Sequence, residues 1–383
     1  MRLLNKGLLI SLALSTALSA SPERFDFSNI RQQAMGGTKV TTAKSSSHFY
    51  QNPALLAKKN KFKIEMLKLG AGLNQSALDD LQKFNEVAEG ENTQDQIDAL
   101  KNLVPLKTNF TFNLLPALAL TLKDINNTNI GLTTYGRGNI NADLKRKTSP
   151  TLYVQGQTNI VSHLAIATQF DVANSPLYVG ISPKYTYRTI FYDKQTGNET
   201  FVMTQSDLLK LANDLADFEP DVYNLSGFGL DVGALYSYTT SEGEGLAGIT
   251  VQNLFSNLSG TQVVSSNTVT ETKDVSVNDS LIVTLGNTMI YDLPVFKKFE
   301  FSVDYNLVAP TTSFLKRVHI GFEKKLTPIL SLRGGLNQGF IVGGFGVNLF
   351  VVKFDYAYFA EEMSNSIGKN TIKSHNIQFG LLF

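Results

Sequence analysis

Four histidines are the residues of this chain best suited to metal binding or proton transfer, and their spacing argues against both roles. His48, His163, His319 and His375 lie far apart in the sequence and in no metal-ligand spacing. The chain has no cysteine, which excludes disulfides, thiolate metal sites, a cysteine nucleophile and iron–sulfur clusters. We therefore expect neither a metal nor another cofactor.

Enzyme motifs are equally poor. Residues 243–248 match the dinucleotide-binding pattern by spelling, but they lead into a strand pattern, whereas a pyrophosphate needs a helix N-terminus. The sequence has no Gly-x-Ser-x-Gly elbow. The 34 Lys+Arg residues nearly balance the 33 Asp+Glu residues, which disfavours a nucleic-acid partner. The protein is predicted not to be an enzyme.

Charged residues instead alternate with apolar ones. From Phe299 to Leu307 the odd positions are apolar and the even positions are polar, and the same period of two recurs at 228–238 and 352–358. The charged positions assigned to the wet face are Lys184, Arg188, Asp231, Asp304, Arg317, His319, Glu323, Arg333, Lys353 and Asp355. Because opposite charges occur close together, we expect a satisfied polar network inside a barrel. The alternative is that one or two cations anchor a substrate carboxylate.

Fourteen alternating segments fill the chain from residue 61 onward. They span approximately 61–73, 114–123, 128–140, 160–172, 176–192, 223–239, 245–256, 279–292, 299–309, 315–326, 329–337, 340–348, 351–361 and 374–383. Segments of about 10 to 17 residues suit tilted membrane-spanning strands better than globular ones. Short connections follow even-numbered segments and several long ones follow odd-numbered segments, as in outer-membrane barrels. The predicted fold class is all-β, a transmembrane antiparallel barrel of about 14 strands.

The N-terminus reads as an export signal over residues 1–20. Arg2 and Lys6 precede an apolar run at 7–17, which is shorter than the roughly 20 residues of a spanning helix. An uncleaved anchor is the alternative. The next stretch shows no alternation and is mostly small and polar, so it is predicted to plug the lumen as a hatch over 21–60, with the barrel at 61–383.

Two of the long connections contain helix patterns, at 76–104 and 204–218. Ser76, Thr93 and Thr204 are each followed three residues later by Asp or Gln, as in capping pairs. The amphipathic segments are too short to be stable alone. We expect them to be extracellular-loop helices that cap the barrel mouth with their apolar faces together. The alternative is an apolar landing groove for a hydrophobic substrate.

The last predicted strand ends in an aromatic residue. Phe379, Leu381 and Phe383 share one face, and this ending resembles the C-terminal signal by which outer-membrane barrels are recognised for insertion. The resemblance implies the barrel-assembly machinery as a partner. Pairing with the first strand would also remove an exposed apolar edge.

A more specific resemblance rests on two short motifs before the first strand. They are Ala34-Met35-Gly36-Gly37 and Asn52-Pro53-Ala54, and together they look like the N-terminal hatch of the FadL-like outer-membrane barrels, the long-chain fatty acid transporter superfamily. Residues 229–236, 253–254 and 354–358 are similar to features of its PorV-like and plasmid-transfer TraF-like branches. The superfamily's barrel has fourteen strands, in agreement with the count made from alternation.

This resemblance implies a bacterial outer-membrane channel for small hydrophobic molecules such as fatty acids. The helical loops lie after the first and fifth strands, earlier than in fatty-acid transporters proper, which leans toward the TraF-like branch. The alternative is therefore a structural or secretion/conjugation-associated barrel that acts through protein partners. Outer-membrane lipid and a small hydrophobic ligand or detergent in the lumen are the other expected partners, and we expect a monomer.

Sideways exit through the wall requires a kink or bulge. The third strand is the family's kink position, which makes Gly136 and Gly138 the candidates for a lateral opening. The alternative is that large neighbouring side chains pack over these glycines.

Overall fold

The strands form one closed antiparallel ring. The computed structural model describes residues 29–42, 46–58, 63–66, 68–75, 83, 87, 92–125, 127–213, 220–265, 270–292, 297–311, 313–349, 351–362, 364, 367–369 and 371–381. In ring order the fourteen strands are β2 (Lys68–Asn74), β3 (Leu106–Ile125), β4 (Thr128–Lys145), β5 (Thr151–Val172), β6 (Ser175–Phe191), β8 (Val222–Thr240), β9 (Gly243–Ser265), β11 (Ile282–Asp292), β12 (Lys297–Val308), β13 (Val318–Lys325), β14 (Leu330–Asn337), β15 (Phe340–Leu349), β16 (Val352–Glu362) and β17 (Thr371–Leu381). Pairing of β17 with β2 closes the ring. The predicted fold class is confirmed, and the predicted signal lies outside the described residues.

Three further strands extend this ring. β1 (Lys63–Met66) pairs with residues 118–121 of β3, beyond the part of β3 that pairs with β2. β7 (Phe201–Met203) pairs with the start of β5, and β10 (Thr270–Val277) pairs with the end of β9. We call the end with the short connections at 173–174 and 241–242 the turn end, and the opposite end the loop end.

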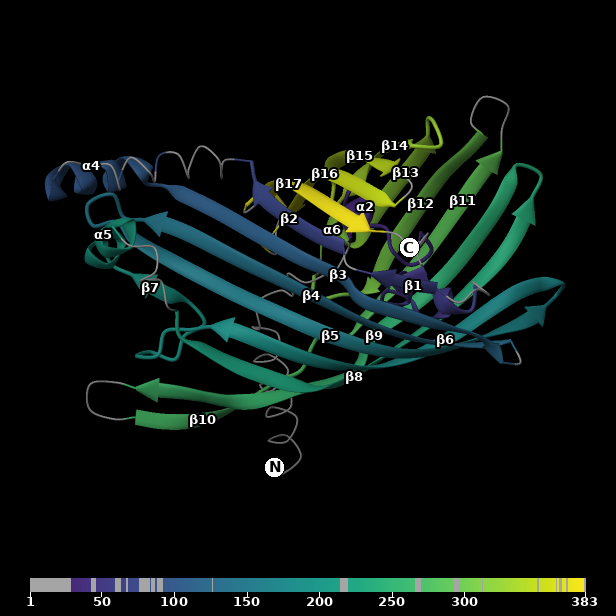
Figure 1. Cartoon of the computed structure of the whole chain (residues 1–383), viewed down its shortest axis with the longest axis horizontal. Helices are drawn as coiled ribbons and strands as arrows, with labels where there is room; N and C mark the ends of the chain where they lie inside the picture. The colour runs from purple at the N-terminus through teal and green to yellow at the C-terminus, as the bar shows by residue number, and fades with distance from the viewer. Residues whose placement is uncertain are drawn as a thin grey trace, which may run out of the picture.

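The ring has two unequal parts (Figure 1). β3, β4, β5, β6, β8 and β9 have 17 to 23 residues each and form what we call the long wall. β11 to β17 have 8 to 12 residues each and, with β2, form the short wall. A membrane-spanning strand needs about 9–11 residues, so only the long wall exceeds that length throughout.

Alternation sorts the side chains as predicted. On β5, Ile160 and Leu164 are about half exposed on the outer face, whereas His163 and Ala165 are buried on the inner face. An apolar outer face suits lipid and a polar inner face suits a barrel lumen. The stretch 141–159, predicted as a long connection, is mostly strand, with a turn at 146–150. The alternation continues there, with Leu144 and Leu152 on outer positions and Asn141 and Gln155 on inner positions, so the prediction ended both strands too early.

Helices α4 (Thr93–Leu103) and α5 (Gln205–Asn213) lie within the two predicted helical insertions. Their apolar residues share one buried cluster, which includes Leu100, Leu103, Leu208 and Leu211. The Asn92 side chain caps α4, one residue before the predicted cap Thr93, so the helix begins at Thr93. In residues 76–91 of the first predicted insertion, only Lys83 and Val87 are described, and Val87 joins the cluster. This packing favours the first alternative, in which the helices bury their apolar faces together. It argues against the second, an open apolar groove.

The remaining helices are short: α2 (Ile30–Gln33), the 3-10 helices η1 (Ser46–Tyr50) and η2 (Pro53–Leu56), and α6 (Phe314–Arg317). Within the described ranges, no helix combines the length and the apolar character that crossing a membrane demands.

Candidate functional site

The inner face of the long wall changes character from the loop end to the turn end. Neighbouring inward residues of β3, β4 and β5 form rows: Asn109, Asn141 and Gln155; then Thr111, Asn139 and Gln157; then Asn113, Arg137 and Asn159; and finally Thr133 with His163 and Gly131 with Ala165. Amide side chains predominate in the rows at the loop end, and the next row contains the charged Arg137. The row nearest the turn end has only small residues. Each level therefore offers a different chemistry to a molecule in the lumen.

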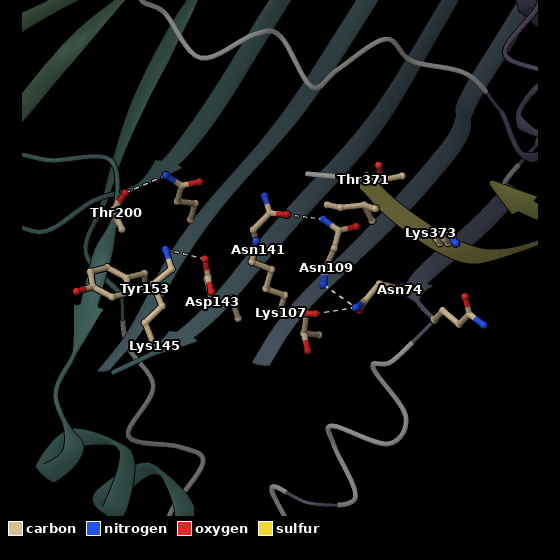
Figure 2. Close-up of a pocket in the computed structure, with 15 residues that line it drawn as sticks. Asn74, Lys107, Asn109, Asn141, Asp143, Lys145, Tyr153, Thr200, Thr371 and Lys373 are labelled. Carbon is tan, nitrogen blue, oxygen red and sulfur yellow. Dashed lines mark hydrogen bonds and ion pairs between the residues drawn. The ribbon is translucent and has the colours of Figure 1, made fainter. Parts of the chain in front are cut away.

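A pocket of about 670 Å³ lies at the loop end, where the long wall meets β2 and β17 (Figure 2); we call it the mouth pocket. Its lining residues are Asn74, Gln75, Lys107, Thr108, Asn109, Asn141, Ala142, Asp143, Lys145, Tyr153, Gln155, Thr200, Thr371, Ile372 and Lys373. Nearly all of these side chains are polar. Its volume lies in the range of small-molecule sites, which are usually much more apolar.

Charged pairs occupy the middle of the long wall. Lys184 Nζ lies 2.8 Å from Asp231 Oδ1 and also donates to Asn253 Oδ1 at 2.5 Å. Arg188 contacts Asp279 at 2.8 Å. Each cation therefore has a partner of opposite charge, as a desolvated ion requires.

Below these pairs, residues 29–42 and 46–57 lie inside the ring; we call this segment the hatch. Its side chains are buried where they are described, and it contacts strands from both walls. η2 packs on β5, β6 and β8, whereas α2 packs on β15, β16 and β17. The two ends of the hatch thus attach to opposite sides of the ring.

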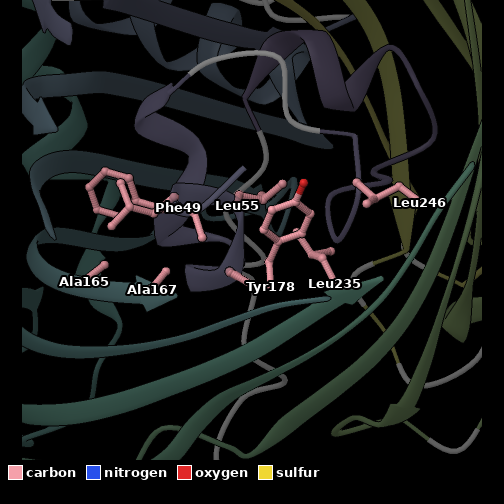
Figure 3. Packing of buried hydrophobic residues seen from close by; sticks show 10 residues of the cluster. Phe49, Leu55, Ala165, Ala167, Tyr178, Leu235 and Leu246 are labelled. Carbon is pink, nitrogen blue, oxygen red and sulfur yellow. The ribbon is translucent and has the colours of Figure 1, made fainter. Parts of the chain in front are cut away.

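The attachment to the long wall is apolar (Figure 3). Phe49 and Leu55 pack in one buried cluster with Ala165, Ala167 and Tyr178. The same cluster includes Leu235 and Leu246. Small alanines on the strand leave space for the larger hatch side chains, which are buried against them.

The predicted Asn52-Pro53-Ala54 motif forms the start of η2. Asn52 Oδ1 accepts from the Ala54 amide at 3.1 Å, and Asn52 Nδ2 donates to the Val40 carbonyl at 3.1 Å. Pro53 occupies the first turn, where its missing N–H costs no hydrogen bond. The motif therefore caps a short helix and joins the two parts of the hatch.

The attachment to the short wall is ionic. Arg31 Nε lies 2.8 Å from Glu323 and Arg31 Nη2 lies 3.0 Å from Glu300, with all three side chains almost fully buried. Arg31 Nη1 also donates to the Thr42 carbonyl at 2.6 Å. Burial alone lowers the pKa of Arg31, but Glu323 and Glu300 together raise that pKa above its ordinary value. The guanidinium therefore stays charged inside the lumen.

This ion pair continues into a network along the short wall. Arg333 contacts Glu323 at 2.8 Å and Asp355 at 2.7 Å, and Lys353 contacts Asp355 at 3.1 Å. With Arg31 and Glu300 included, three cations face three carboxylates. Equal numbers of charges let each buried ion find a partner, which is the satisfied network predicted from the sequence.

The predicted Met35-Gly36-Gly37 motif turns the chain away from α2. Gly36 and Gly37 have φ angles of +69° and +81°, a region that side chains disfavour. His319 Nδ1 lies 2.9 Å from the Gly36 carbonyl, and Asp304 accepts from the backbone of Lys39 and Val40 at 2.6 and 3.0 Å. Wall residues thus hold the hatch backbone directly.

Eight inward glycines surround the hatch, and we call them the glycine girdle. A Cβ atom on any of them would lie against a hatch residue: Gly131, Gly180, Gly233, Gly248, Gly286, Gly321, Gly335 and Gly344. They come from eight different strands of both walls. Glycine inside a strand often marks close approach of another chain segment, and here that segment is the hatch.

The predicted luminal residues fall inside the ring with one correction. Lys184, Arg188, Asp231, Asp304, His319, Glu323, Arg333, Lys353 and Asp355 belong to the contacts described above. Arg317 does not, because it ends the short helix α6 and donates to the carbonyls of Thr311 and Leu307. The strand β13 begins only at Val318, so parity could not be extended back to Arg317.

Gly136 and Gly138 lie on the outer face of β4, opposite Leu114 and Phe112. The β4–β5 ladder is unbroken, whereas the β3–β4 register shifts across residues 115–117 of β3. Pro116 lies in that bulge and cannot donate a ladder hydrogen bond. The irregularity therefore belongs to the neighbouring strand, and the Phe112 ring covers Gly138. Lateral exit here stays a prediction.

The C-terminal strand presents Phe379 and Leu381 on the outer face, about half exposed, and buries Asn376 and Gln378. Phe383 lies outside the described residues. The orientation agrees with a lipid-facing stripe, while recognition by the assembly machinery stays a prediction.

Sequence reasoning missed Arg31, Glu300, the glycine girdle and the mouth pocket. Arg31 is a lone charge in a small-residue segment, which signals a buried ion that needs acidic partners. Glycines at inward parity on eight strands were a second available signal. The pocket left no such signal, because it joins residues of five strands. Among the described residues, no cluster of His, Asp or Glu could hold a metal ion.

These features define a class: a fourteen-stranded antiparallel barrel whose N-terminal segment fills the lumen. No protein-family model matches the chain, and no curated protein matches it in sequence. Two of the solved structures that are similar to it share its fold. The toluene transporter TbuX of Ralstonia pickettii is 14% identical, with a TM-score of 0.52 and 94% of this chain and 99% of that chain covered.

The second is the deltaS2S3 mutant of the monoaromatic hydrocarbon channel TodX, which is 12% identical with a TM-score of 0.51. The match covers 94% of this chain and all of that chain. At this identity the likeness shows the fold alone, which is the fourteen-stranded antiparallel barrel predicted from the sequence, and membership of the FadL-like superfamily stays a prediction. Both proteins are described as a transporter or a channel, not as enzymes.

Proposed function

We propose that this protein is a channel in the bacterial outer membrane for small hydrophobic molecules. The observation that carries the proposal is the fourteen-stranded ring closed around an N-terminal hatch, on a fold shared with a toluene transporter and a monoaromatic hydrocarbon channel. The half-exposed apolar outer face supports placement in lipid. We infer a monomer that needs no cofactor and is inserted by the barrel-assembly machinery.

The apolar side of the hatch supports this function. Displacement of η2 would uncover Ala165, Ala167 and Tyr178 on the long wall, and a hydrophobic solute could cover that surface again. Burial of apolar surface is favourable by about 25 cal/mol per Å², so such a solute would stabilise the displaced state. Toluene and medium-chain fatty acids are the substrate classes to test first.

A second candidate is a structural barrel, or one associated with secretion or conjugation, that acts through protein partners. The ionic attachment favours it, because Arg31 is almost fully buried between Glu300 and Glu323, and this ion pair opposes displacement of α2. The loop helices also bury their apolar faces against one another instead of presenting them to a solute.

Uptake by whole cells separates the two candidates. A Gram-negative host without hydrocarbon channels would express the full chain, and initial uptake of labelled toluene and laurate would be measured. A matched variant carries Ala54→Cys and Ala167→Cys, which lie in one cluster, in a chain that has no other cysteine. We expect cells that express the parent chain to take up the solutes faster than the empty host. In the cysteine variant, oxidation should join the two cysteines in a disulfide and abolish this gain in uptake, and reduction should restore it. Uptake no faster than in the empty host, for both solutes, would favour the second candidate.

A further inference from the structure

The outer surface of β14 and β15 is the lowest part of the barrel wall, and together with its turns we call it the thin side. The two strands meet in the turn 338–339 at the loop end, and β14 follows the turn 326–329 at the turn end. Both strands are therefore limited in length. The exposed apolar residues of β14 run from Ile329 to Leu336, which covers about 18 Å across a membrane for a strand tilted by about 40°.

The long wall presents a taller apolar surface. On β5 the exposed apolar residues run from Ile160 to Val172, which covers about 30 Å at the same tilt. The apolar band of an outer-membrane barrel is typically about 25 Å tall. The long wall fills such a band, whereas the thin side falls short of it.

The turns of the two walls differ in the same sense. On the long wall, residues 239–242 are exposed and all polar. On the thin side, the turn-end residues Leu326, Ile329, Leu349 and Val351 are about half exposed and all aliphatic. The Asn348 amide donates to the Ile329 carbonyl at 2.9 Å, which holds the two turns side by side. These turns continue the apolar outer surface of their strands, so the same lipid should cover them.

The loop end of the thin side is apolar as well. Ile341 on β15 is 78% exposed, and α6 exposes Phe314 and Leu315. The next residue of α6, Lys316, points the other way: it is buried and donates to the carbonyls of Glu362 and Ser364 at 3.0 and 2.7 Å. Apolar side chains therefore border the thin side at both ends.

The thin side has few ways to fit a membrane of ordinary thickness. Tilting would shorten its span further. Long charged side chains could reach the interface, but the outer positions of β14 and β15 carry only aliphatic residues, Phe345 and glycines. A short apolar surface without such side chains is matched by a locally thinner bilayer.

We propose that the thin side binds lipids with short acyl chains, so that the bilayer is thinner beside β14 and β15 than beside the long wall. Short chains bring the polar headgroups to the level of the turns, and the apolar turn residues then lie at the edge of the hydrocarbon. This surface rests on the membrane placement in the proposed function, but it does not depend on passage of solutes.

The chain has no tryptophan, so a single introduced tryptophan reports on the lipid around it. Leu332→Trp places it on the outer face of β14, and Leu164→Trp is the matched control on β5, at similar exposure. The purified full chain would be reconstituted in mixtures of phosphatidylcholine with 14-carbon chains and brominated phosphatidylcholine with 18-carbon chains. Bromine quenches tryptophan on contact, so quenching against composition gives the relative binding of the two lipids at each position.

We expect the preference for short chains to be at least about twofold greater at Leu332→Trp than at Leu164→Trp. Phe345→Trp on β15 is a second reporter, and heat-modifiable mobility shows that each variant is folded. Equal preference at both walls would overturn the thin side alone. Quenching at neither wall would overturn the membrane placement too. Quenching at Leu164→Trp only would mean that protein, such as a second copy, covers β14.

The position of the turns is tested separately with acrylamide, which quenches tryptophan from water. Ile329→Trp should be at least about threefold less accessible to acrylamide than Thr240→Trp, the matched turn residue of the long wall, which is exposed. Equal accessibility would place the apolar turns in water, where they could meet a protein partner, and would overturn their contact with lipid.

Discussion

The two halves of the hatch are attached to the two walls by different forces. On the short wall, α2 is held by Arg31 between Glu300 and Glu323. On the long wall, η1 and η2 insert Phe49 and Leu55 among small apolar residues. An ionic attachment is strong only while every partner is present, whereas an apolar attachment weakens gradually as area is lost. Truncation of one charged side chain should therefore loosen the α2 half abruptly. The η2 half should loosen in proportion to the change in side-chain volume.

The largest effect is expected from Arg31→Ala. It removes the guanidinium that lies 3.0 Å from the buried Glu300, and breaking a buried ion pair costs about 3–5 kcal/mol. Hydrogen exchange should accelerate roughly a hundredfold or more at residues 29–42 and far less at 46–57. Arg317→Ala is the matched control, since that arginine donates to the carbonyls of Thr311 and Leu307, which lie outside the hatch. Equal acceleration in both halves would show that the hatch opens as one unit.

Gly180→Val addresses the other half. The new side chain would overlap Pro53 of η2, and overpacking typically costs about 1–3 kcal/mol. Exchange should now accelerate at 46–57 first, the reverse of the Arg31 result. Gly343→Val is the control, because its Cβ would approach no atom closer than the Arg333 carbonyl at 3.4 Å. Unchanged exchange in Gly180→Val would mean that the girdle does not press on the hatch.

A smaller effect is expected on the outer face. Gly138→Val would strike the Phe112 ring and should destabilise the barrel by about 1 kcal/mol, while Gly136→Val meets only ordinary contact with Leu114. Adding Phe112→Ala should recover most of the loss, as urea unfolding of the single and double variants would show. If the double variant shows no such recovery, overlap with the Phe112 side chain does not explain why residue 138 is a glycine.

The smallest effect concerns α5, far from both attachments. The Thr204 hydroxyl donates to Asp207 at 2.6 Å and holds the pKa of that carboxyl below its ordinary value. The bond therefore persists above the ordinary carboxyl pKa and is lost as pH falls through the lowered pKa. Thr204→Val should raise the pKa of Asp207 measured by NMR and leave that of Asp98 on α4 unchanged. A fixed Asp207 pKa would contradict this capping contact.

Alternation made the ring predictable from the sequence. Fourteen segments were counted and fourteen strands form the ring, because lipid outside and polar groups inside impose a period of two on each strand. The alternation continues through 141–159, but the prediction ended both strands near the length of a membrane-spanning strand, whereas β4 and β5 have 18 and 22 residues. Arg317 was misassigned for a related reason, since parity has no meaning once the strand has ended.

The site was less predictable because it depends on contacts between distant residues. His319 and Glu323 could be assigned to the lumen by parity, but nothing local to either shows that Gly36 and Arg31 are their partners. Gly138 illustrates the same limit. Its neighbour Phe112 lies on another strand, and only the strand register shows that the Phe112 side chain lies over Gly138. A single sequence does not show which distant residues contact one another in the barrel.

Pairing of β17 with β2 joins Gly380 to Lys68, so the seam forms between segments that lie far apart in the chain. The hatch precedes β1 in the chain and lies inside the finished ring. Because the glycine girdle leaves no spare space around it, the hatch has to be in place before the seam closes. Closure of so long a loop is entropically slow, and a hatch bound to both walls would hold the unfinished ring together while the last strand arrives.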